Sequence, residues 1–199
     1  MARAGLSHDA VVRIALDLVD AGGPTGCADL PLATVAAQAG VAAPGVLAQG
    51  GRARGPRREV AVVAVGDYTR ALTDATVGLA GPDAVAALAH ATRRYARAHP
   101  GRYAAVQVAP DPDDPADAAR AAAAGGSVQG VAAVVRGGGL GEGGWGCGGA
   151  GPRASLHGFV ALALGGGSRL RADHARGCAL LGRALLPGQA ALARPPAGA

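Results

Sequence analysis

Residues 32–44 read LATVAAQAGVAAP, and they are the most informative segment for the N-terminal part of the chain. Its apolar side chains recur with the spacing of one helix face, at Leu32, Val35, Ala36 and Ala39. Gly40 follows at the position where helices commonly end in the left-handed conformation. Pro44 suits the first turn of a next helix, where a missing backbone N–H does no harm. Two short helices joined by a tight glycine turn predict a helix-turn-helix.

An amphipathic segment lies upstream of this stretch. Ser7 is a good helix N-cap, and Asp9 stands in the first turn, where the helix dipole favours an acid. The apolar stripe behind them consists of Val11, Val12, Ala15, Leu16, Leu18 and Val19. Asp17 and Asp20 are expected to face outward, and residues 22–24 (Gly-Gly-Pro) end this helix. With a third helix from Pro44 onward, the first fifty residues predict three short helices.

Helical spacing continues through the rest of the chain, and the composition agrees with it. Further helices are predicted in the segments 59–79, 85–99, 103–106, 116–124, 156–164 and 172–186. The chain holds 51 Ala and 34 Gly among 199 residues and only 3% aromatic residues, so Ala, Leu and Val must build the core. Since Ala favours helices and no strand-like alternation occurs, the predicted fold class is all-α.

Charge, cysteine content and hydropathy limit the environment of the protein. All 19 basic residues are Arg, and neither Lys nor Asn occurs, which indicates a GC-rich bacterial genome. The formal charge of +5 permits a polyanionic partner but does not require one. The three cysteines lie far apart, which argues against a disulfide framework and against a cysteine metal site. Because no signal peptide and no uninterrupted apolar span is recognisable, we expect no membrane association and a cytoplasmic location.

The sequence contains no catalytic constellation. The five histidines show no H-E-x-x-H spacing, and no serine lies in G-x-S-x-G. Residues 139–144 match the dinucleotide pattern G-x-G-x-x-G, but Trp145 and further glycines follow in place of a helix. The aspartates between 111 and 117 alternate with prolines, which is ordinary turn and cap chemistry. We therefore expect no enzyme, no cofactor and no metal.

Four segments, taken in order, resemble a TetR-type transcriptional regulator with a WHG-class C-terminal domain. They are Val11–Asp20, Leu32–Pro44, Tyr95–Tyr103 and Ser155–Val160. The resemblance implies an all-helical homodimer that reads an operator in double-stranded DNA through two recognition helices in successive major grooves. It also implies that the last two helices form the dimer interface and that the C-terminal domain binds a small-molecule effector. The pocket residues that it implies are Tyr95, His99, Tyr103, His157 and Phe159.

The resemblance also defines domains. It implies a three-helix helix-turn-helix domain at residues 1–55 and a helical ligand-binding and dimerisation bundle at residues 56–190. A disordered tail is expected at residues 191–199, where two prolines and several small residues stand.

The DNA contacts implied by the resemblance depart from the family pattern. They are Thr34, Ala43, Pro44, Gly45, Leu47, Ala48, Gln49, Arg52 and Arg54. The family normally has a Tyr in place of Leu47 and a His in place of Gln49, and both contact phosphates, which supply much of the affinity of a DNA-binding protein. The arginines between residues 52 and 58 are expected to form a solvated basic face and to supply the nearest phosphate contacts.

Residues 137–152 read GGGLGEGGWGCGGAGP, where the family normally has a helix. Each Gly lowers helix stability by roughly 1 kcal/mol relative to Ala, so no stable helix is expected to run through this segment. A flexible loop, a decayed gene and a stretch read in a shifted frame are all consistent with it. The predicted function is a ligand-responsive repressor. The alternative is a helical dimer of the same fold that has lost DNA binding and is a ligand-binding or partner protein, or the product of a decayed gene.

Overall fold

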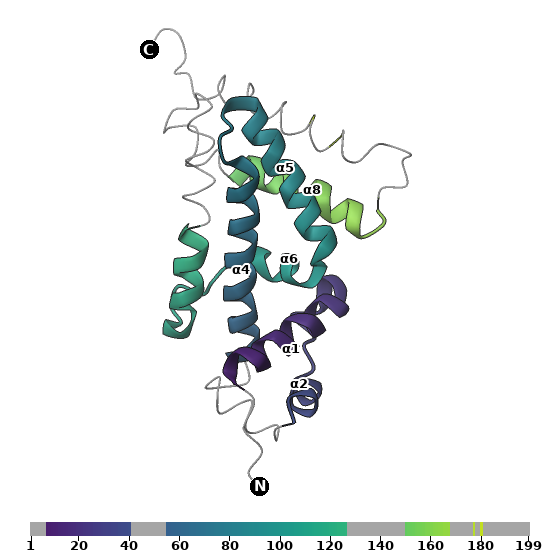
Figure 1. The fold of residues 1–199 in the computed structure, drawn as a ribbon, viewed down its shortest axis with the longest axis vertical. Helices are drawn as coiled ribbons and strands as arrows, with labels where there is room; N and C mark the ends of the chain where they lie inside the picture. Colours follow the sequence, from purple (N-terminus) through teal and green to yellow (C-terminus); the bar gives the residue numbers. More distant parts are fainter. Residues whose placement is uncertain (1–6, 41–54, 127–149, 168–176, 178–179, 181–199) are drawn as a thin grey trace. The chain divides into compact units, whose positions relative to one another are not determined.

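The computed structural model describes residues 7–40, 55–126 and 150–167, together with Gly177 and Leu180. All regular structure in these ranges is helical, and no strand occurs in them, which confirms the predicted all-α fold (Figure 1). None of the described helices combines the length and the hydropathy that crossing a lipid bilayer requires.

The helices keep the labels of Figure 1. They are α1 (His8–Ala21), α2 (Leu32–Ala39), α4 (Gly55–Thr76), α5 (Gly81–Ala98), α6 (Pro100–Gln107) and α8 (Ala150–Leu164). Two short 3₁₀ turns lie at Gly23–Thr25 and Pro115–Asp117, and residues 118–126 are helical. The chain divides into two compact units, Met1–Tyr68 with Ala98–Ala124 and Thr69–Arg97 with Gly125–Ala199.

Helix boundaries agree with the predicted ones in most places. α4 begins at Gly55, earlier than the predicted Glu59, because Pro56 is well tolerated in the first turn of a helix. α8 begins at Ala150, so that the last three residues of the glycine-rich segment are helical, and the remainder of that segment lies outside the described residues. The predicted third helix at 43–50 and the predicted tail at 191–199 also lie outside them. Of the predicted last helix, Gly177 and Leu180 are described and are helical.

In the first unit, α1 and α2 pack together around one apolar core. Its buried members are Val11, Ala15, Leu16, Val19, Leu30, Val35, Ala36, Ala39 and Val60. These residues include the predicted apolar faces of both helices, and Val60 adds the start of α4. Burial of apolar surface at about 25 cal/mol per Å² is therefore what holds these two helices together.

The caps of α1 and α2 also follow the sequence. The side-chain oxygen of Ser7 accepts a hydrogen bond from the backbone N–H of Ala10, at 3.4 Å. α2 ends at Gly40, whose φ of 64° is left-handed, and the Gly40 N–H donates to carbonyls in the last turn of α2. This geometry is the tight glycine turn expected between the two helices of a helix-turn-helix.

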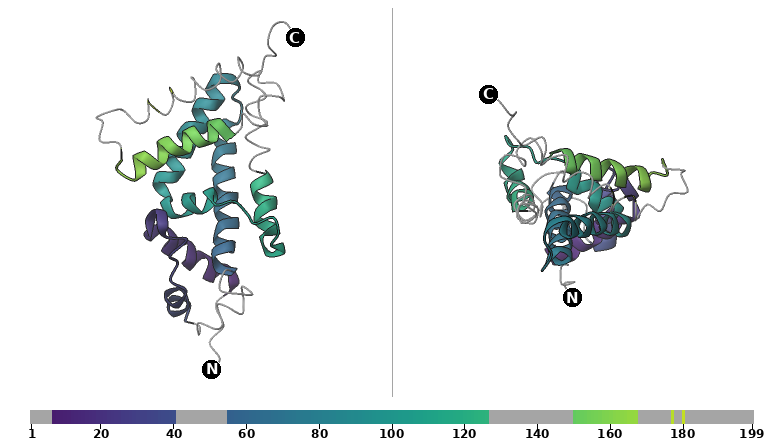
Figure 2. Two further views of the ribbon diagram at one scale, coloured as in Figure 1. Left: turned by 180° about the vertical axis from the view of Figure 1, so that it is seen from behind. Right: turned by 90° about the horizontal axis from the view of Figure 1, so that it is seen from above.

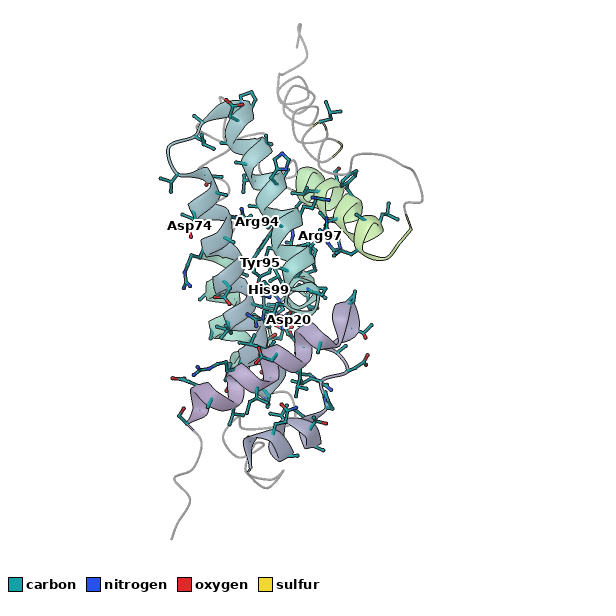
Figure 3. All side chains as sticks on the ribbon, turned by 45° about the vertical axis from the view of Figure 1, so that its right-hand side comes forward. Asp20, Asp74, Arg94, Tyr95, Arg97 and His99 are labelled. Carbon is teal, nitrogen blue, oxygen red and sulfur yellow. The ribbon has the colours of Figure 1, made fainter. Side chains whose placement is uncertain are left out.

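In the second unit, α5 has one buried face and one basic face. Leu88, Thr92 and Tyr95 are buried at the predicted spacing, and Val160 of α8 is also buried. Arg94 and Arg97, labelled in Figure 3, are exposed on the far side of α5.

Two glycine-to-alanine substitutions test the backbone of the first unit. Gly40→Ala places a Cβ on a left-handed residue and should lower the free energy of unfolding by about 1–2 kcal/mol. Gly66→Ala, in an exposed position of α4 with open space around it, should raise the free energy by about 0.5–1 kcal/mol, because Ala favours the helix. Urea denaturation measures both. A Gly40→Ala variant as stable as the wild type would contradict the left-handed cap.

Candidate functional site

The predicted DNA-binding residues lie mainly in a segment that is not described. Thr34 is on α2, where its side chain is half-buried. The others fall between residues 41 and 54, outside the described residues: Ala43, Pro44, Gly45, Leu47, Ala48, Gln49, Arg52 and Arg54. The structure therefore describes the elements that adjoin this segment, α2 before it and α4 after it.

The end of α1 makes a close backbone contact with the start of α6. A Cβ atom on Gly101 would lie only 1.9 Å from the carbonyl oxygen of Val19, and one on Gly26 would lie 2.0 Å from the same oxygen. Real Cβ atoms do not approach an oxygen so closely, so both positions require glycine. α6 packs directly against α1, as Figures 1 and 2 show from opposite sides.

An ion cluster lies beside this contact and is centred on Asp20, the residue after Val19. The Asp20 Oδ2 atom lies 2.9 Å from His99 Nδ1 and 2.8 Å from Arg102 Nε. The Oδ1 atom accepts the backbone N–H of Arg102 at 3.2 Å. Figure 3 shows Asp20 of α1 and His99, the N-cap of α6, facing each other. Asp20, predicted to face outward, is thus partly buried, because α6 covers it.

Arg102 extends the cluster to α4. Its guanidinium lies 3.8 Å from Asp17 and 3.6 Å from Asp67, and only 16% of its side chain is exposed. The pairs of Arg102 with Asp20 and Asp67 are partly buried and are therefore screened less by salt than surface pairs, whereas Asp17 is 76% exposed and contributes little. This role of Arg102 is not predicted from the sequence, although the residue lies in segment 95–103, which resembles the family.

A second ion cluster lies at the start of α4. Arg58 pairs with Asp114 and places its Nε atom 2.8 Å from Asp117 Oδ1. Arg120 lies 3.7 Å from Asp117 Oδ2 and donates to the carbonyl of Val108 at 2.7 Å. The expectation of a solvated basic face is therefore wrong for Arg58, because the Asp-rich turn folds back onto it.

The Asp-rich turn behaves as its proline spacing predicted. Asp114 Oδ1 accepts the N–H of Ala116 and so caps the 3₁₀ turn, while Asp111 Oδ1 accepts the N–H of Asp113. Within the described ranges, no group of His, Cys, Asp or Glu side chains has the arrangement of a metal site.

The predicted pocket residues are distributed over both units. In the first, His99 caps α6, and Tyr103 is buried with its ring edge-on to Tyr68 at a centroid distance of 5.9 Å. In the second, Tyr95 of α5 is buried, whereas His157 and Phe159 of α8 are half-buried. Burial and the nearby Arg153 lower the pKa of His157 below its usual 6.5. His99 and Tyr103 thus belong to the α6 segment of the first unit, and His157 and Phe159 belong to α8 of the second unit.

The first unit also has an open groove of about 450 Å³, which was not predicted from the sequence. Val12 and Leu16 of α1 and Val62 and Val63 of α4 contribute apolar walls. His8 and Glu59 meet at its rim with an N–O distance of 3.2 Å, and burial raises the pKa of Glu59.

Comparison with known proteins gives one finding. A family model described as the tetracyclin repressor-like C-terminal domain matches residues 85–185, which is just over half of the chain. No curated protein matches the chain. The narrower WHG class expected from the sequence remains a prediction.

The substitution Gly101→Ala tests the contact between α1 and α6. Because the new Cβ would overlap the Val19 carbonyl, α6 must move away from α1, and we expect the free energy of unfolding to fall by roughly 1–3 kcal/mol. Thermal denaturation measures the loss, with Gly66→Ala as the control that adds the same methyl group in open space. An unchanged melting temperature for Gly101→Ala would rule out the close approach.

The lowered pKa of His157 predicts an acid-sensitive stability. A group whose pKa is lower in the folded state binds protons more weakly there, so its stabilising contribution is present above pH 6.5 and is lost as the pH falls. We expect His157→Gln to reduce the drop in melting temperature between about pH 7.5 and about pH 5.5. His90→Gln, at an exposed position of α5, is the control and should leave that drop unchanged. Equal drops for wild type and His157→Gln would disprove the prediction.

Proposed function

The chain belongs to the TetR, or tetracyclin repressor-like, family of regulators, and on that premise we propose that it is a ligand-responsive transcriptional repressor. It acts as a cytoplasmic homodimer on a double-stranded DNA operator. Residues 1–55 bind DNA, and residues 56–190 bind a small-molecule effector and form the dimer. The observation that carries the proposal is the left-handed turn at Gly40, which ends α2 against α1 and leads directly into the predicted recognition segment.

DNA recognition is assigned to residues that follow this turn. In a helix-turn-helix dimer, each recognition helix enters the major groove and the two half-sites lie about one DNA turn apart. Gln49 can hydrogen-bond the edge of an adenine, and Arg52 and Arg54 can bind phosphates. Arg13, exposed on α1, adds a further cation to the same unit.

The effector signal reaches the DNA-binding domain through α6. α5 carries the predicted pocket residue Tyr95 and ends one residue before His99, which caps α6. Since Asp20 pairs with both His99 and Arg102, a shift of α6 displaces the end of α1. Packed helices shift between discrete arrangements. A small displacement of helices at the effector pocket therefore changes the distance between the two recognition helices of the dimer.

One observation favours a weaker DNA-binding protein. Arg58, expected near phosphates, is engaged by Asp114 and Asp117, which reduces the set of available phosphate contacts. Together with Leu47 and Gln49 in place of phosphate-binding residues, this supports the second candidate, a helical dimer of the same fold that has lost DNA binding.

A gel-shift titration separates the two candidates. The probe is a DNA duplex from the region flanking the gene of this protein, titrated at about 50 mM and about 200 mM salt. A repressor gives a shift that weakens steeply with salt, because bound phosphates release counterions. No shift at the lower salt concentration would eliminate the repressor proposal and leave the second candidate.

A matched pair of variants tests the predicted phosphate contacts. Replacing Arg52 and Arg54 by Gln should weaken binding and flatten the salt dependence by about 0.9 in the log–log slope for each lost phosphate contact. Replacing Arg94 and Arg97 by Gln removes the same charge from the exposed face of α5 and should leave the slope unchanged. Equal effects of both pairs would mean that only overall charge matters.

A further inference from the structure

Arg58 lies in the first turn of α4, directly after the predicted recognition segment. Only 17% of its side chain is exposed, and its guanidinium pairs with two carboxylates, those of Asp114 and Asp117. A guanidinium with two carboxylate partners has few donors left for a third anion. Its position in the sequence predicts a DNA contact, whereas its pairing with two carboxylates indicates a structural role within the protein.

Asp117 connects Arg58 to the rest of the first unit. The residue is 4% exposed, and its Oδ2 atom accepts the backbone N–H of Asp111 at 2.8 Å. Arg120, on the helix that follows, lies 3.7 Å from the same atom and binds the carbonyl of Val108 at the end of α6. Asp117 therefore links the first turn of α4 to the helix 118–126, and Arg120 continues this link to the end of α6.

Moving Arg58 to a DNA phosphate would disturb this arrangement. The two arginines and two aspartates of the cluster balance in charge, and removing Arg58 leaves the buried carboxylate of Asp117 with Arg120 as its remaining ion-pair partner. Breaking a buried ion pair by taking away one partner is strongly unfavourable, since the remaining charge is desolvated without compensation. A phosphate contact by Arg58 would therefore be opposed by the loss of its pairing with Asp117.

We propose that Arg58 is a positioning residue of the DNA-binding domain: paired with Asp117, it fixes the direction in which the chain leaves the recognition segment and enters α4. The inference rests on the proposed DNA-binding function for its consequence in affinity. Its structural part concerns the start of α4 and stands without DNA.

Asp117→Asn should have opposite effects on DNA affinity, depending on whether Arg58 contacts a phosphate or positions the start of α4. Removing a negative charge near DNA strengthens binding if only electrostatic attraction is changed. Loss of positioning weakens binding instead, and we expect roughly tenfold weaker binding, the scale of a coupling energy between contacting residues. Stronger or unchanged binding by Asp117→Asn would overturn the proposal.

Arg58→Lys provides a second, milder test. A Lys retains a phosphate contact as a point charge but cannot reach two carboxylates with a planar fork. We expect weaker binding to the same flanking duplex with an unchanged salt slope. Arg94→Lys, on the exposed face of α5 and not among the predicted DNA contacts, is the control and should leave the affinity unchanged. Unchanged affinity of Arg58→Lys would also overturn the proposal.

Amide hydrogen exchange separates this inference from the proposed function. In the free protein, Arg58→Lys should accelerate exchange in the first two turns of α4 and at the N–H of Asp111, and the control Arg94→Lys should not. Faster exchange in Arg58→Lys, in a protein that does not shift the duplex at all, removes the proposed function but supports the positioning. Exchange rates equal to wild type would refute the positioning, whatever the wild type does with DNA.

Discussion

The carbonyl oxygen of Val19 contacts the backbone at both Gly26 and Gly101, and the arrangement of the first unit depends on this close approach. It brings the backbone at the start of α6 so close to the end of α1 that no Cβ atom fits between them. The neighbouring residue Asp20 then lies within reach of His99 and Arg102, and their ion pairs hold the contact in one register. The apolar core brings the helices together, and the two glycines determine how closely they meet.

α6 is restrained at both of its ends. Its first turn is paired with Asp20 of α1, and the carbonyl of Val108, which follows its last residue, is bound by Arg120 of the cluster that holds Arg58. In sequence, α1 comes before the helix-turn-helix segment and α4 comes after it. An eight-residue helix is therefore linked to the helices that precede and follow the predicted DNA-binding segment, so that a movement of α6 is coupled to both.

The sequence predicted those features that depend on neighbouring residues. Ser7 and Gly40 delimit α1 and α2 correctly because caps and apolar spacing are local signals. The ion clusters were not predictable in this way, since Asp20 and His99 are 79 residues apart and Arg58 and Asp114 are 56 apart. Helical periodicity predicted that Asp20 faces outward, but periodicity carries no information about α6, which covers this residue.

The net charge of +5 is a poor guide to DNA binding, because it is a sum over the whole chain and does not tell which arginines are paired with carboxylates. In the first unit Arg58, Arg102 and Arg120 are paired with carboxylates, and their charges attract a polyanion only weakly at a distance. An attraction to DNA must come from cations without such partners, such as the exposed Arg13. For the proposed repressor, an affinity for an operator would therefore depend on arginines outside these ion clusters, and the paired ones would contribute through the placement of α4.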